Sequence, residues 1–152
     1  MSLVTDRKDL DETLLPNGQQ RTYLVLSDEE RAKGFVRPVR HSYKHVGKRP
    51  KYELRDLTEA ERAYNEGQPE TEHFVKFEVY PEGMKATGRF WTQRELDSGC
   101  GTATTMGREL AETYARQPTF YGGTFCCRCG THLPVGEDGE FVWEPDGSRV
   151  GT

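Results

Sequence analysis

Hydrophobic residues along the chain gather in short clusters separated by polar stretches that contain glycine or proline. Four clusters are rich in the aromatic and β-branched residues typical of short strands, and they cover 23–26, 74–80, 120–125 and 141–143. The Pro-Glu-Gly sequence at 81–83 predicts a turn that brings 88–92 back beside the preceding strand. The pattern therefore predicts several short antiparallel strands.

Helical periodicity is clearest at 105–116, where apolar residues recur at four-residue spacing. Pro118 disfavours helix at the residue before it and should end this segment. Two shorter helices are expected to begin at Ser27 and Thr58, because each is followed three residues later by a glutamate that can complete a capping box. The expected fold class is α+β, with short antiparallel strands around one main helix.

The length of 152 residues suits one small domain. Residues 1–20 are polar, lack periodicity and contain Pro-Asn-Gly, so we expect a flexible N-terminal arm followed by a single domain over 21–152. With 34% hydrophobic and 30% charged residues, the domain can bury only a modest core. Such a domain gains stability from a metal or a cross-link, which makes its cysteines informative.

The chain has no run of about 20 apolar residues that could cross a bilayer. Its first residues also lack the apolar segment of a secretory signal, so we expect a cytoplasmic protein. Thiols are reduced in that compartment, and clustered cysteines there bind metal more often than they form disulfides.

The strongest motif is Cys-x2-Cys-Gly, formed by Cys126, Cys129 and Gly130. This spacing is typical of a zinc knuckle, in which two thiolates converge on one ion and the glycine adopts the positive φ of a tight turn. Structural zinc sites have four ligands, and Cys100 is the natural third. His132 lies three residues after the second knuckle cysteine and is the closest fourth candidate.

The predicted ligands of a structural Zn²⁺ are therefore Cys100, Cys126, Cys129 and His132. Among the histidines, His41, His45 and His73 are more distant alternatives. Cys127 should point away from the ion, because neighbours on an extended chain face opposite sides, and we expect it to be a small buried residue.

Two catalytic interpretations of the cysteine motif fit the sequence poorly. Thioredoxin-type motifs place the first cysteine at a helix N-terminus, whereas the residues at 130–134 cannot begin a regular helix. Zinc deaminases combine Pro-Cys-x2-Cys with an upstream His-x-Glu, but the chain has no His-x-Glu, and Phe125 precedes the first cysteine. The sequence thus indicates no catalytic residue.

Basic residues are concentrated in 31–55, which carries a charge of +8 in a chain whose net charge is −4. Such a segment either binds a polyanion or lies against the acidic remainder of the protein. Its candidate contacts to phosphates and bases are Arg37, Arg40, Tyr43 and Lys44. Net acidity argues against strong nonspecific DNA binding.

The start of the expected main helix is a second candidate ligand site. Thr104 and Thr105 could bind a phosphate there through their hydroxyls and the free helical N–H groups. The alternative is ordinary capping of the helix by a threonine, with Cys100 tethering the helix to the metal.

Several short sequences together resemble small zinc-binding proteins encoded by tailed phages and prophages. They are 34–40, 88–92, Cys100-Gly101 with Thr104-Thr105-Met106, 111–116, 120–122 and Cys126-x2-Cys129-x2-His132. The resemblance covers residues 21–152 and singles out the same three cysteines and His132. That family has no assigned activity, so the resemblance implies a phage setting in a host cell and little chemistry.

These observations lead to an expectation of a non-enzymatic, zinc-stabilised binding module with a macromolecular partner, nucleic acid being favoured over protein. The alternative is a zinc-dependent hydrolase, or a binder without turnover, acting on a nucleotide-like phosphate compound. The hydrolase requires only three cysteine ligands, with His132 free to act as a base. The sequence indicates no oligomeric state.

Overall fold

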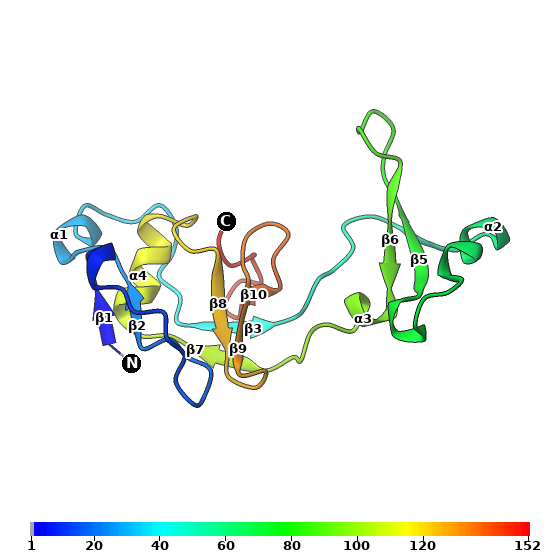
Figure 1. Ribbon diagram of the computed structural model, residues 1–152. Helices are drawn as coiled ribbons and strands as arrows, with labels where there is room; N and C mark the ends of the chain where they lie inside the picture. Colours follow the sequence, from blue (N-terminus) through cyan, green and yellow to red (C-terminus); the bar gives the residue numbers. More distant parts are fainter. Residues whose placement is uncertain (1) are drawn as a thin grey trace. The chain divides into compact units, whose positions relative to one another are not determined.

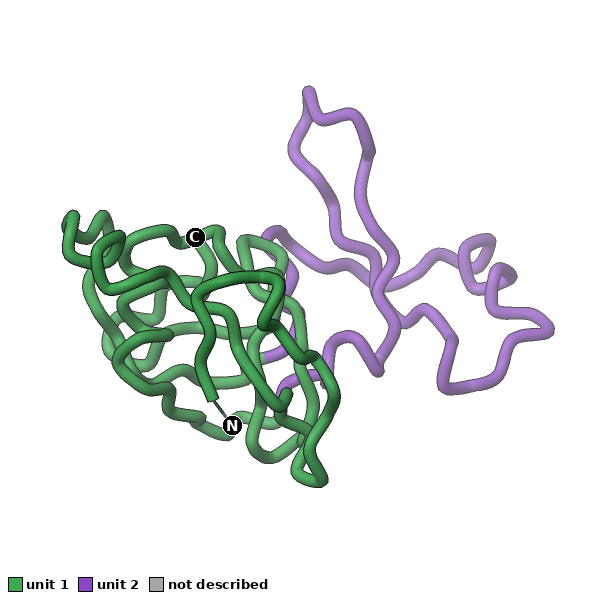
Figure 2. The backbone as a smooth tube through the Cα atoms, turned by 60° about the vertical axis from the view of Figure 1, so that its left-hand side comes forward, with its two compact units in different colours: residues 1–46, 100–152 green, residues 47–99 purple. Residues whose placement is uncertain are grey.

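The computed structural model describes residues 2–152, and its fold is α+β, with short, mainly antiparallel sheets and few short helices (Figure 1). The chain divides into two compact units (Figure 2). Unit 1 contains the chain up to Val46 and again from Cys100 onward, whereas unit 2 is the intervening stretch Gly47–Gly99.

The described residues of unit 1, from Ser2 onward, form seven strands and two α-helices. The strands are β1 (Ser2–Val4), β2 (Thr22–Leu24), β3 (Ser42–His45), β7 (Ala103–Thr105), β8 (Gly123–Cys126), β9 (Thr131–Pro134) and β10 (Phe141–Trp143). The helices are α1 (Asp28–Arg31) and α4 (Arg108–Arg116), with a 3₁₀ turn, η1, at Arg7–Asp9. Within residues 2–152 no helix is long and apolar enough to cross a membrane.

Strand β3 is the centre of a three-stranded antiparallel sheet in the order β10-β3-β7. Its residues alternate, so that Tyr43 and His45 are buried whereas Ser42 and Lys44 are only half-buried. Strands β8 and β9 form a separate hairpin, in which Cys126 pairs with Thr131 across the turn.

The core of unit 1 is aromatic and continuous with two of the cysteines. Trp143 packs edge to face on both Tyr43 and Tyr114, with ring centroids 6.1 and 5.4 Å apart. Phe141, Val150 and Cys126 complete this buried cluster, and Cys100 is half-buried against it. The cysteine motif therefore lies inside the structural core.

Helix α4 begins later than its periodicity predicted. The sequence favoured a helix from 105, but 103–105 form β7 and the helix begins at Arg108 after Gly107 as N-cap. The β-branched Thr104 and Thr105 favour a strand, and both residues lie in register with β3, where Thr104 is opposite Tyr43. The helix ends at Arg116, close to Pro118 as expected.

Residues 2–4, within the stretch predicted to be a flexible N-terminal arm, form strand β1. Strand β1 pairs with β2 in parallel. Further along, Gly18 has φ of 91°, and a Cβ added there would lie 1.9 Å from the carbonyl oxygen of Gly130. This stretch therefore packs closely on the cysteine turn, and only a glycine fits at this position.

Unit 2 is built on the antiparallel sheet β4-β5-β6, formed by Leu54–Asp56, Phe74–Val79 and Gly88–Thr92. Its helical elements are α2 (Glu59–Arg62), α3 (Gln93–Leu96) and the 3₁₀ turns η2 (Ala63–Asn65) and η3 (Glu70–Glu72). The predicted β5–β6 hairpin is confirmed, and so is the capping box between Thr58 and Glu61.

A buried carboxylate organises unit 2. Glu78, on β5, is 3% exposed. One of its oxygens accepts hydrogen bonds from the backbone N–H groups of Lys51 (2.7 Å) and Tyr52 (2.8 Å), and the other accepts from Nε1 of Trp91 (2.9 Å). Glu78 therefore ties the entry segment of unit 2 to its sheet.

We expect Glu78→Gln to destabilise unit 2 by about 1–3 kcal/mol, because its amide NH₂ would face N–H donors where an acceptor is needed. Hydrogen exchange at the amides of Lys51 and Tyr52 measures this locally, and both should exchange faster. The exposed Glu82→Gln is the matched control and should change stability by less than about 0.5 kcal/mol. Equal exchange in the two variants would contradict the role given to Glu78.

Candidate metal centre

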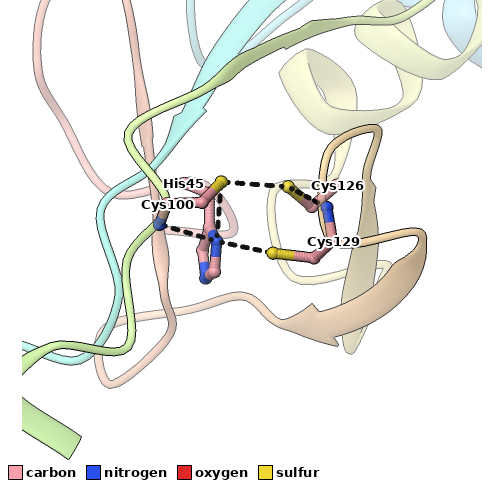
Figure 3. A group of neighbouring side chains, drawn as sticks. All are labelled: His45, Cys100, Cys126 and Cys129. Carbon is pink, nitrogen blue, oxygen red and sulfur yellow. Dashed lines mark hydrogen bonds between the residues drawn. The ribbon is translucent and has the colours of Figure 1, made fainter. Parts of the chain in front are cut away.

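Four side chains converge on one point in unit 1. Nδ1 or Nε2 of His45 and the Sγ atoms of three cysteines all lie within 4.8 Å of one another, the cysteines being Cys100, Cys126 and Cys129 (Figure 3). His45 and Cys126 are buried, and Cys100 is half-buried. All four cysteines of the chain are free thiols.

Three separate parts of unit 1 supply these groups. His45 is the last residue of β3, and Cys100 precedes β7, the strand that pairs with β3. Hydrogen bonding between the backbones, from Gly101 N–H to the His45 carbonyl (2.8 Å), holds these two segments together. Cys126 ends β8, and Cys129 lies in the turn that leads to β9.

The turn has the features expected of a zinc knuckle. Gly130 adopts a φ of 66°, which a residue with a side chain rarely adopts. Its N–H donates to the carbonyl of Cys126 at 2.8 Å, and the N–H of Cys129 points to Sγ of Cys126 at 3.5 Å. The backbone therefore directs a donor toward a sulfur, which is the electrostatic support that a metal-bound thiolate receives.

The separations of the donor atoms suit a tetrahedral zinc ion. Sγ of Cys100 lies 3.5 Å from Sγ of Cys126 and 3.3 Å from Nδ1 of His45, which is 3.5 Å from Sγ of Cys129. Zinc–sulfur and zinc–nitrogen bonds of usual length imply tetrahedral edges of about 3.8 Å between sulfurs and about 3.5 Å between sulfur and nitrogen. The residues thus fit a structural metal site such as zinc.

The three thiols compete for ionisation. Burial opposes ionisation of Cys100, yet the hydrogen bonds of this thiol, first among them the one from the backbone of Thr102, outweigh it and lower the pKa to about 6. At Cys129, burial and the neighbouring sulfurs raise the pKa to about 12. A divalent cation removes this conflict, because it favours the thiolate form of all three cysteines at once.

Glu140 fixes the orientation of the histidine. Its Oε1 lies 3.0 Å from Nε2 of His45, and both side chains are more than nine-tenths buried. Since a carboxylate accepts hydrogen bonds, Nε2 carries the proton and the lone pair of Nδ1 faces the thiols. A carboxylate on the outer nitrogen of a ligating histidine is a recurrent feature of zinc sites.

The structure places His45, and not the expected His132, with the three thiols. In the β8–β9 hairpin, His132 lies opposite Phe125, and residues that pair across strands share a face. Cys126 follows Phe125 and so faces the other side. Nε2 of His132 instead forms a 2.7 Å hydrogen bond with the hydroxyl of Tyr23, and burial lowers the pKa of its ring.

A signal for His45 was present in the sequence. Tyr43 and His45 alternate with the polar residues Ser42 and Lys44, which is the period-two pattern of a strand with one buried face. The basic character of the surrounding segment obscured this pattern. The other two distant candidates are not in the cluster: His41 is exposed, and His73 belongs to unit 2.

The residues proposed to contact nucleic acid do not share an accessible surface. Arg40 is buried, donates to Asp146 (2.8 Å) and Ser148 (2.7 Å), and stacks on Trp143. Hydrogen bonds from Ser148, and then from Arg40, lower the pKa of Asp146 to about 2. Tyr43 belongs to the core.

The remaining candidate contacts are also dispersed. Arg37 is exposed and donates to the carbonyl of Thr152 at 3.2 Å, whereas Lys44 is half-buried on β3. Thr104 and Thr105 lie in β7 and do not begin the main helix, so the phosphate site expected there is not formed as predicted.

Cys127 is exposed, which corrects the expectation that it is a small buried residue. Its N–H donates to the hydroxyl of Thr104 (3.1 Å), and its Sγ lies 3.5 Å from the carbonyl of Ala103. It points away from the metal cluster, as the alternation of an extended chain predicts, but the side to which it points is solvent-accessible.

Comparisons of the chain with models of protein families, with curated proteins and with solved structures find no match. The chemistry of the site is therefore inferred from the positions of its own residues.

We expect the purified protein to contain one Zn²⁺ per chain, and His45→Ala to lose most of it, because three cysteines leave one tetrahedral position to water. Elemental analysis after dialysis measures the zinc content. His132→Ala and Cys127→Ser are the matched controls and should keep the metal. Zinc retained by His45→Ala and lost by His132→Ala would show that the fourth ligand is misassigned.

We expect Glu140→Gln to weaken zinc binding about 10–100-fold, because the histidine loses the carboxylate that orients it and raises its basicity. Competition with a chromogenic chelator gives the affinity. Glu144→Gln is the control, since Glu144 is exposed and hydrogen-bonds to Ser42 instead. An unchanged affinity in Glu140→Gln would remove Glu140 from the metal site.

Proposed function

We propose that this protein is a non-enzymatic, zinc-stabilised binding module. The observation that carries the proposal is the set of four protein donors around one point. Structural zinc sites use four protein ligands, whereas catalytic sites use three and keep one position open for water or substrate. A Cys₃His set that fills the tetrahedron supports a structural role for the ion.

The alternative zinc-dependent hydrolase has less support. It requires an open metal position and a free base beside it, and His132 was the candidate for that base. His45 instead supplies a fourth donor, and His132 is hydrogen-bonded to Tyr23. A binder of nucleotide-like phosphates would need a cationic or N–H-rich pocket, and the threonines considered for it lie in a strand.

Protein is a better-supported partner than nucleic acid. Three arginines of the basic segment 31–55 form ion pairs within the protein. Arg31 pairs with Asp28 and Glu112, Arg40 with Asp146, and Arg55 with Glu61. The segment thus lies partly against the acidic remainder of the chain, and we favour a protein partner; the phage setting in this proposal comes from the sequence resemblance.

Substitution of zinc by Co²⁺ tests whether the metal is closed to ligands. A tetrahedral Cys₃His site should give intense visible bands that are unchanged by added inorganic phosphate or imidazole, because four protein donors leave no position for them. The His45→Ala protein is the matched control, since it has an open position and its spectrum should respond to imidazole. A response of the unaltered protein to phosphate would favour the hydrolase.

A further inference from the structure

Unit 1 contains a cavity of about 100 Å³ between the start of α4 and the strands β7 and β8. Its walls are largely apolar and include Tyr23, Met106, Leu110, Tyr114 and Phe125. Two of its other lining residues, Thr105 and Gly107, are exposed, so the cavity reaches the surface there. Its volume is below that of the 150 Å³ apolar cavity that accepts benzene, which suits a branched aliphatic side chain.

A second, shallower hollow of about 420 Å³ adjoins the cavity along β7. The two share four lining residues, which are Gln19, Thr104, Thr105 and Phe125. In the part of the chain that the structure describes, neither is lined by a lysine, arginine, aspartate or glutamate. The phosphates of a nucleic acid would therefore find no lysine or arginine in this lining, which suits an uncharged ligand better.

Strand β7 forms one edge of its sheet. Its hydrogen bonds to β3 alternate along the chain. The N–H of His45 donates to the carbonyl of Thr102 (3.1 Å), and the N–H of Met106 donates to the carbonyl of His41 (2.8 Å). Tyr43 and Thr104 lie opposite each other midway between these two bonds, and by the alternation of an antiparallel ladder they form the next hydrogen-bonded pair. The backbone groups of Ala103 and Thr105 consequently face away from β3.

The outward edge of β7 is available for pairing at Thr105. The carbonyl of Ala103 accepts a contact from the thiol of Cys127, whereas Thr105 borders both hollows and is exposed. Within residues 2–152, β3 is the only strand that pairs with β7. An exposed edge with unpaired N–H and C=O groups is a template for another strand.

We propose that this edge binds an extended, uncharged segment of a partner protein, which pairs with β7 at Thr105 and inserts one aliphatic side chain into the cavity. The inference rests on the proposed function as a binding module and names the partner's chemistry. Strand addition supplies main-chain hydrogen bonds, and a neighbouring pocket supplies side-chain selectivity. The edge, the cavity and the uncharged lining all favour this occupant.

Short capped peptides of the form Thr-Val-Xaa-Val-Thr test the proposal on the full-length, zinc-loaded protein. With leucine as Xaa, the peptide should shift the backbone amide signals of Thr105, Gly107 and Phe125 in NMR spectra. With lysine as Xaa, or with the leucine peptide N-methylated at the amide that pairs with Thr105, binding should weaken about tenfold or more. Equal binding of all three peptides, or binding of none, would overturn the proposal.

Leu110→Trp should abolish leucine-peptide binding by filling the cavity, and Leu14→Trp is the matched control at an exposed site outside both hollows. Zinc content is measured in each sample first, so failure of the peptide to bind a zinc-loaded protein counts against this site alone. A single-stranded oligonucleotide that shifts the same amides, when the peptides do not, would replace the protein partner by nucleic acid.

Discussion

Three thiols and one imidazole meet at one point in this protein, and the negative charge of several thiolates there requires a nearby cation. In the absence of a cation, hydrogen bonds lower the pKa of Cys100, whereas burial and the neighbouring sulfurs raise that of Cys129, so the thiols do not ionise together. The ligands come from segments 55 and 26 residues apart, and closing such loops costs conformational entropy. A bound divalent ion meets this charge requirement and offsets that cost in one step.

The candidate metal centre packs directly against the hydrophobic core of unit 1. Cys126 is buried in the same cluster as Tyr43 and Phe141, and the ring of Phe141 packs on that of His45 with centroids 5.0 Å apart. Glu140 immediately precedes Phe141, so the residue that starts β10 also brings the carboxylate to the histidine. Packing thus orients the four candidate ligands, and a metal bound by them would cross-link the core of a very polar chain.

Local features could be predicted from the sequence, and long-range ones could not. The knuckle at Cys126–Gly130, the β5–β6 hairpin and the capping box at Thr58 depend on residues close in sequence. The identity of the fourth ligand depends on which face of each strand is turned toward the thiols. Proximity in sequence favoured His132, but the pairing of the strands places His45 beside the thiols instead. The start of α4 was misplaced for a related reason: pairing of β7 with β3 overrides a helical apolar pattern.

Unit 2 is encoded entirely between two of the ligands, since Val46 alone separates His45 from it and Cys100 follows it directly. The backbone on either side is already joined where Gly101 meets His45. A contact within unit 1 thus holds the two ligands that flank unit 2 close together. Such an arrangement allows unit 2 to be lengthened, shortened or replaced during evolution while the metal-binding residues of unit 1 keep their positions.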